Sequence, residues 1–345
     1  VMTALLSQAG NVTLSGSQLT SQRDATLASL TMTGSEAAFG NTTVAGDVSV
    51  TGGVLTTGNL TGQNLTVRDQ ASVNGKTAHV ASLDAKDGTI VLDAITSDGT
   101  ILLDNTTLKG HVVSGADMIV TNAGAVTSTG ATTLDSLTMT NAEDSSFGDL
   151  TVNGNVSLTG TKLTANLVKG GDTTLSASDI TSKGTTELTS LAMTNGSNAV
   201  FVTLTIGGTF DVNGSILSAN IAEAGIATVT NGGKVTSTGK TTLASLTMTD
   251  AQESFFGDLT VTGDVNLTNT KLTANLASGE DVDLTGSTLV STGVSNLTTL
   301  SLAEGSDAQF GSVNVAGNLD VNASVLKGEL TQAGATTVGA NGQIL

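Results

Sequence analysis

The pentapeptide Ser136-Leu137-Thr138-Met139-Thr140 recurs along the 345-residue chain and decides its fold. It returns as Ser190-Leu191-Ala192-Met193-Thr194 and as Ser245-Leu246-Thr247-Met248-Thr249. Related segments lie around Leu30, Leu83 and Leu300, so the central leucine returns about every 54 residues, a period typical of stacked repeat architectures. We therefore divide the chain into the repeats 1–53, 54–106, 107–161, 162–215, 216–270 and 271–324, with a partial seventh, 325–345.

Each repeat contains three shorter periods. Pairs of apolar residues two positions apart return at steps of roughly 18 residues, as in Val265/Leu267, Val282/Leu284 and Leu300/Leu302. Residues i and i+2 of a strand point to one face, so such pairs stack into an apolar column. The sequence therefore predicts an all-β chain: one continuous parallel β-solenoid over residues 1–345, with about 18–19 coils of about 17–19 residues each. At ~4.8 Å per coil this would extend roughly 90 Å. A right-handed helix is favoured because the strict six-residue pattern of left-handed coils is missing, but handedness itself is not fixed.

Two phases of the repeat hold a nearly constant residue. A phase occupied by Gly in all six repeats predicts a turn with positive φ, or a backbone packed too closely for a Cβ. A second phase holds Phe in five repeats and Leu92 in the remaining one. Three coils separate these side chains, roughly 14 Å, so we predict core fillers rather than a stacked binding strip. The turn glycines are Gly46, Gly99, Gly154, Gly208, Gly263 and Gly317, and the core phenylalanines are Phe39, Phe147, Phe201, Phe256 and Phe310.

Composition narrows the class of partner. The 30 acidic and 12 basic residues give a net charge of −18, which would repel a phosphate backbone, so nucleic-acid binding is not expected. No apolar run approaches the ~20 residues of a membrane helix, so no membrane insertion is expected. Pro is absent, in keeping with uninterrupted strand ladders. Cys is absent too, so the chain has no disulfides and no thiolate metal ligands.

A T-x-T pattern on the outward face of the same strands is the candidate binding surface. Its members are Thr31, Thr33, Thr138, Thr140, Thr228, Thr230, Thr247 and Thr249. A regular Thr array resembles the ice-binding face of β-solenoid antifreeze proteins, and implies an ice-binding or carbohydrate-binding solenoid as the alternative function. Charged residues such as Arg68, Asp84 and Lys86 interrupt the array. Thr is also a favoured residue on any exposed strand face.

Few residues of the chain suit catalysis or metal binding. Asp47, Asp149, Asp258 and Asp264 lie near turns, where Ca²⁺ could take carboxylate ligands, but scattered solvated carboxylates are the simpler interpretation. The two histidines, His79 and His111, are interpreted as surface residues. We therefore expect no cofactor, no catalytic residues and no enzymatic activity.

The runs GDLTVNGNVSL (148–158) and GDLTVTGDV (257–265) resemble the repetitive β-helical regions of haemagglutinin-type adhesins, autotransporter passengers and phage fibres. The ending VGANGQIL (338–345) is also similar to phage fibres. This resemblance implies a non-catalytic structural rod that is extracellular or on a cell surface. Exposed strand edges recruit other strands unless they are capped, and no capping repeat is recognisable at either end. The expected partners are a second copy, stacked end to end in a filament, or flanking domains of an adhesin stalk.

Overall fold

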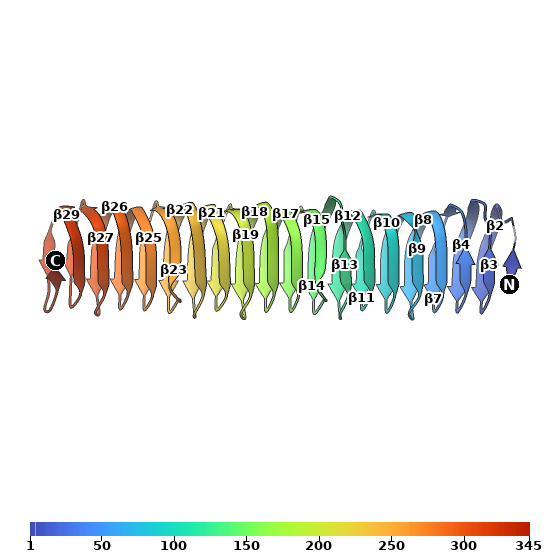
Figure 1. Cartoon of the computed structure of the whole chain (residues 1–345), viewed down its shortest axis with the longest axis horizontal. Helices are drawn as coiled ribbons and strands as arrows, with labels where there is room; N and C mark the ends of the chain where they lie inside the picture. The colour runs from blue at the N-terminus through green and yellow to red at the C-terminus, as the bar shows by residue number, and fades with distance from the viewer. Residues whose placement is uncertain (4) are drawn as a thin grey trace. The chain divides into compact units, whose positions relative to one another are not determined.

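The computed structural model describes residues 1–3 and 5–345 and contains strands but no helix in that part of the chain. It divides into two compact units, Val1–Gly171 and Asp172–Leu345, here called unit 1 and unit 2. In each unit the strands stack in parallel, coil upon coil (Figure 1). The predicted all-β parallel solenoid is confirmed, with about 19 coils of about 18 residues. The described residues include no helix that is long and apolar enough to cross a membrane.

About half of the coils contain a single strand of 15 or 16 residues, and the others contain two or three shorter strands. In unit 1 they are β1 Met2–Thr3, β2 Gln8–Ser15, β3 Gln18–Thr20, β4 Ala25–Thr33, β5 Glu36–Ala38, β6 Thr42–Val44, β7 Val48–Thr51, β8 Val54–Arg68, β9 Ser72–Lys86, β10 Thr89–Ser97, β11 Ile101–Asp104, β12 Thr107–Thr121, β13 Ala125–Thr127, β14 Thr132–Thr140, β15 Ser145–Val152 and β16 Val156–Thr159. Strand β17, Lys162–Ser176, contains the boundary between the units. In unit 2 they are β18 Asp179–Thr194, β19 Asn198–Ile206, β20 Phe210–Asn213, β21 Ile216–Thr230, β22 Lys234–Thr249, β23 Ser254–Val261, β24 Val265–Thr268, β25 Lys271–Thr285, β26 Thr288–Ala303, β27 Asp307–Val315, β28 Leu319–Val321, β29 Val325–Gln332, β30 Thr336–Val338 and β31 Gln343–Ile344.

The apolar pairs that define the repeat form the core. In unit 1, Leu30 lies opposite Val48, which lies opposite Leu65. In unit 2, Val282 lies opposite Leu300 in the same way. All five side chains are buried. Because each coil covers its neighbour's apolar residues, the core is a column that no single coil could bury alone.

The chain turns once per coil at a left-handed residue, directly after the outward T-x-T strand, and at some corners the next residue is left-handed too. Most of these corner residues are Gly, Asn or Asp, the types that adopt positive φ most readily. Because they recur once in every coil, the distance between successive corners sets the coil length. The corners are Gly16, Gly34, Gly52, Asp69, Asp87, Asn105, Asn122, Asn141 and Gly160 in unit 1, and Ala177, Asn195, Gly214, Asn231, Asp250, Asn269, Gly286, Glu304, Ala323 and Asn341 in unit 2.

Buried hydroxyl groups follow many of these corners. The N–H of Ser197 donates to the Oγ of Ser215 in the next coil at 3.2 Å, and the N–H of Ser287 donates to the Oγ of Ser306 at 3.2 Å. Each Oγ then donates back to a nearby carbonyl of its own coil, as Ser215 does to Asn213 at 2.9 Å. Because each hydroxyl both accepts and donates a hydrogen bond, these polar groups can lie inside the solenoid.

Candidate functional site

The six repeat glycines lie where two coils approach each other closely, and none has a positive φ. A Cβ added to Gly46, Gly99, Gly154, Gly208, Gly263 or Gly317 would lie 2.7–3.0 Å from a carbonyl oxygen of the preceding coil. The sequence left two explanations open, and the close approach is correct while the positive φ is wrong. The left-handed corners lie elsewhere and are often Asn or Asp.

The five repeat phenylalanines are all buried, with exposed fractions from 0 to 7%. Four of them lie in β15, β19, β23 and β27, next to a register shift where their coil has one more residue than its neighbour. Leu92 lies at the corresponding place in β10. The side chain therefore fills the coil at the point where the backbone ladder is locally interrupted.

The T-x-T face of unit 1 is regular only in part. Thr31 and Thr33 are exposed and lie opposite Ser49 and Thr51 in the next coil. Thr138 and Thr140 are half-buried and lie opposite Ser157 and Thr159. Between these two stretches, charged side chains occupy the same columns.

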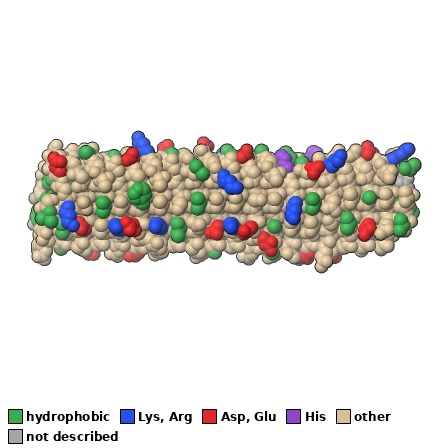
Figure 2. Space-filling view, in the orientation of Figure 1, with side chains coloured by type: hydrophobic (Ala, Val, Ile, Leu, Met, Phe, Trp, Pro, Cys, Tyr) green, Lys and Arg blue, Asp and Glu red, His purple; other side chains and the backbone are tan. Residues whose placement is uncertain are grey.

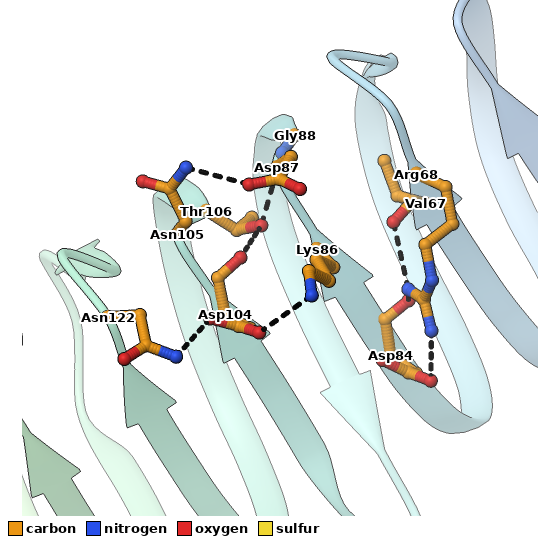
Figure 3. Close-up of polar contacts among 10 residues, drawn as sticks. All are labelled: Val67, Arg68, Asp84, Lys86, Asp87, Gly88, Asp104, Asn105, Thr106 and Asn122. Carbon is orange, nitrogen blue, oxygen red and sulfur yellow. Dashed lines mark hydrogen bonds and ion pairs between the residues drawn. The ribbon is translucent and has the colours of Figure 1, made fainter.

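Those charged side chains form the polar cluster of unit 1 (Figure 3). Arg68 forms an ion pair with Asp84 of the next coil, and Lys86 Nζ lies 3.6 Å from Asp104 Oδ2. Asn122 Nδ2 donates to Asp104 Oδ1 at 2.7 Å from one coil further on. These three contacts each join successive coils, so the charged side chains bind neighbouring coils to one another.

In unit 2 the T-x-T face has one continuous threonine column. Thr228 lies directly opposite Thr247, and Thr230 lies directly opposite Thr249. The column of Thr230 and Thr249 continues through Thr268 and Thr285, whereas the column of Thr228 continues through Asn266 and Asp283. The structure therefore brings together the four threonines predicted in this unit, beside a column that includes an acidic residue.

Burial raises the pKa of two aspartates on this face. For Asp211 the cause of the raised pKa is desolvation of the carboxylate. For Asp283 desolvation is the largest cause; the negative charges of Asp281 and Asp264 also raise its pKa, and a hydrogen bond with Ser301 opposes the shift. A raised carboxyl pKa means that the folded state disfavours ionisation, so stability increases as pH falls through that pKa.

We expect Asp283→Asn to raise the midpoint of thermal unfolding at pH 7, because the amide has no charge to desolvate or repel. The gain should disappear below the ordinary carboxyl pKa of 3.8, where Asp283 is itself neutral in both states. Asn266→Asp, which adds a carboxylate opposite Asp283, should have the opposite effect at pH 7. Thermal melts of the three proteins at pH 7 and pH 3 measure this; an equal gain for Asp283→Asn at both pH values would contradict it.

The aspartates considered for calcium have amide neighbours. Three of them accept a hydrogen bond from an asparagine one coil later, at 2.7–2.9 Å. Asp264 Oδ1 accepts the N–H of Asp281 at 3.4 Å. Within residues 1–3 and 5–345, His, Asp and Glu side chains form no group of three that could hold a metal ion. The three amide pairs are Asp47 with Asn64, Asp149 with Asn166 and Asp258 with Asn275.

The two histidines also contact other coils. His79 Nε2 lies 3.1 Å from Asp98 Oδ1, and both side chains are mostly exposed. His111 Nε2 lies 2.8 Å from the carbonyl oxygen of Ala131. The two imidazoles therefore lie in separate places, and each contacts one oxygen of a neighbouring coil.

In comparisons with known proteins, no family model matches the chain, and no curated protein or solved structure matches it. We therefore infer its function from contacts within the chain.

Proposed function

We propose that the chain is a non-catalytic structural module of an extracellular or cell-surface fibre, extended by pairing of one coil on the next. The observation that supports this most is that polar side chains form hydrogen bonds from one coil to the next. Asn105 donates to Asp87 at 2.7 Å, and Asn269 donates to Asp250 at 3.1 Å, each from one coil to the coil before it. Side chains that could otherwise serve chemistry thus reinforce the stack.

The backbone supports the same role. Most coils pair in parallel with the coil on either side, so any force or fluctuation acting on one coil is shared with its neighbours. On the face drawn in Figure 2, most hydrophobic side chains lie singly among backbone and uncharged polar side chains, with acidic and basic groups interspersed. Such a surface suits a long-lived module in water, and the net charge of −18 keeps copies from clumping laterally.

The location is inferred from resemblance. The repeat runs at 148–158 and 257–265 are similar to those of adhesins, autotransporter passengers and phage fibres, which act outside the cell. This resemblance implies an extracellular fibre or stalk. A stalk segment or a filament subunit is the corresponding role for this chain.

The partner at each terminal coil is a further β-coil, from a flanking domain or from a second copy. In the coil of β30, Val338 is 49% exposed, whereas Val321, its register partner one coil earlier, is 1% exposed. In the coil of β2, Leu14 is half-buried, whereas Met32 opposite is fully buried. Another coil would cover these apolar residues and pair the open backbone edge.

Electron microscopy of the purified chain over a range of concentrations tests end-to-end pairing. We expect fibres that lengthen with concentration, and expect Val338→Lys to abolish them by placing a charge on the open edge. Val294→Lys is the matched control, because Val294 is 60% exposed within an internal coil, and it should form fibres normally. Single particles at every concentration would exclude the second copy and leave a flanking coil as the partner. Fibres that persist in Val338→Lys would exclude pairing through this edge.

A further inference from the structure

One strand in most three-coil repeats carries an extra residue. Strands β12, β21 and β25 each shift register by one position against the preceding coil, which leaves a bulged residue that matches nothing opposite. The bulged residues, Val113, Ala222 and Ala277, are exposed and occupy the same phase of their repeats. Strand β17 shifts in the same way at Val168. We refer to β12, β21 and β25 as the bulged strands.

Each bulge diverts a backbone N–H out of the ladder. The residue just before the bulge is buried, and its N–H must find another acceptor. It donates to a serine hydroxyl of the next coil at 3.0 Å in all three bulged strands. These bonds join Val112 to Ser128, Ile221 to Ser237 and Leu276 to Ser291.

A second hydroxyl four positions later completes the arrangement. Ser237 Oγ lies 2.9 Å from Thr241 Oγ1, and Ser291 Oγ lies 3.2 Å from Ser295 Oγ. Ser295 Oγ also donates to the carbonyl of Leu276 at 2.6 Å, so one residue of the bulged strand has both backbone groups bound. We call each such buried pair a hydroxyl clamp; the clamps that bind the bulged strands are Ser128 with Thr132, Ser237 with Thr241 and Ser291 with Ser295.

A glycine between the two hydroxyls lets the clamp pack closely against the bulged strand. The clamp sequence is S-x-G-x-[ST], with Gly130, Gly239 or Gly293 at its centre. A Cβ added to any of these glycines would overlap a side-chain atom of the residue two positions before the bulge. Those residues are His111, Asn220 and Asn275, respectively.

The chain contains its own comparison, because one coil pair lacks both features. Strand β8 keeps one register against β5 and β6 of the preceding coil from Val54 to Thr61, so it has no bulge at this phase. Gly75 of β9 lies opposite Leu92, just as the clamp residue Ser237 lies opposite Phe256 at the same phase. Ala78 of β9 takes the place of the second hydroxyl. In these coil pairs the hydroxyl clamp is thus present where the bulge is present and replaced where the bulge is absent.

We propose that the bulge and the hydroxyl clamp form a pairing code that selects which coil stacks on which. Apolar columns recur in every coil, so a chain that skipped a coil while folding would still align its core. A bulged strand paired with the wrong coil would instead bury an N–H and a carbonyl without partners. This inference goes beyond the proposed structural role and applies to folding of the chain wherever it acts.

Cysteine cross-links in the full chain test the code, since the chain has no Cys of its own. Thr228 lies directly opposite Thr247, so Thr228→Cys with Thr247→Cys reports native pairing. Asn266 lies one coil further, roughly 9.6 Å from Thr228, beyond the ~7 Å reach of a disulfide. Thr228→Cys with Asn266→Cys therefore reports a coil that has been skipped.

The clamp variant Ser237→Ala/Thr241→Val is unfolded, refolded and oxidised with each reporter pair. We expect the skipped cross-link to increase about tenfold or more over the protein with the unaltered clamp. Without the two hydroxyls, the buried N–H and carbonyl of the bulged strand no longer favour the native coil over the next one. Ser237→Thr/Thr241→Ser, which keeps both hydroxyls, should restore native pairing. Ser237→Ala alone takes the place of the double variant if that protein does not fold.

Two controls separate the code from general destabilisation. Thr236→Ala/Thr242→Val alters two partly exposed neighbours on the same strand and should leave the skipped cross-link at its basal level. Phe256→Ala removes core packing but keeps the clamp, and should refold with native pairing. The code is overturned if the clamp variants give only the native cross-link, or if Phe256→Ala gives as much skipped cross-link as they do.

Discussion

Replacing Phe256 by alanine should lower the free energy of unfolding by about 3–5 kcal/mol, the usual effect of removing a buried ring. Phe256 is fully buried in β23 and lies opposite Ser237 of β22. The coils on either side are held by their own ladders and cannot close over the cavity, so little of the lost stability is recovered. Denaturant unfolding of the full chain measures the loss.

Phe255 provides the matched control for this prediction. It is the preceding residue on the same strand and points outward, with 42% of its surface exposed. Phe255→Ala removes the same atoms from a site that is already partly in water, so we expect a loss of about 1 kcal/mol or less. Similar losses for the two variants would show that Phe256 is not a core filler.

Gly154→Ala should destabilise the protein by about 1–3 kcal/mol, as expected for a group forced into a packed site. The added Cβ would lie 2.7 Å from the carbonyl oxygen of Asp135. That oxygen also accepts the Gly154 N–H at 2.7 Å, so it cannot move away without weakening the bond between the two coils. Denaturant unfolding measures the effect.

Gly207 is the control for Gly154 because it lies in a comparable turn with more space. A Cβ there would be 3.9 Å from the nearest oxygen, and its φ is not positive. Gly207→Ala should be neutral or stabilise the protein by about 0.4–1 kcal/mol, since alanine restricts the unfolded chain more than glycine does. Equal destabilisation by Gly154→Ala and Gly207→Ala would contradict the close approach of coils at Gly154.

The fold could be predicted because its main driving force is visible in the sequence. Apolar pairs such as Val282/Leu284 mark the same strand in every coil, and their spacing gives the coil length directly. The buried position of the repeat phenylalanines could be anticipated in the same way. Both features depend on burial, which leaves a clear pattern of residue types.

The corners were harder to predict because two different backbone requirements select glycine. Gly154 is required by close packing, whereas Gly160 is required by its left-handed φ. Asn141 also adopts this left-handed φ, so the corner column has no constant residue. A pattern search for glycine therefore finds the packing position and misses the corner.

The hydroxyl clamps could not be separated from surface serines by composition. Ser237 is buried and Ser245, further along the same strand, is not, yet both stand among threonines. What distinguishes Ser237 is a contact with another coil: its hydroxyl accepts the N–H of Ile221, the residue just before the bulge of β21. The available signal is the motif S-x-G-x-[ST], which begins once in each of four repeats, at Ser128, Ser182, Ser237 and Ser291.

The matching of bulge to hydroxyl clamp also limits how such a gene can grow. Inserting or losing a single coil beside β21 would place a bulged strand against a coil without the clamp and leave buried groups unpaired. Inserting or losing all three coils restores every match. Duplication and recombination within the gene should therefore persist mainly in blocks of about 54 codons, which makes the three-coil repeat the unit of inheritance as well as of structure.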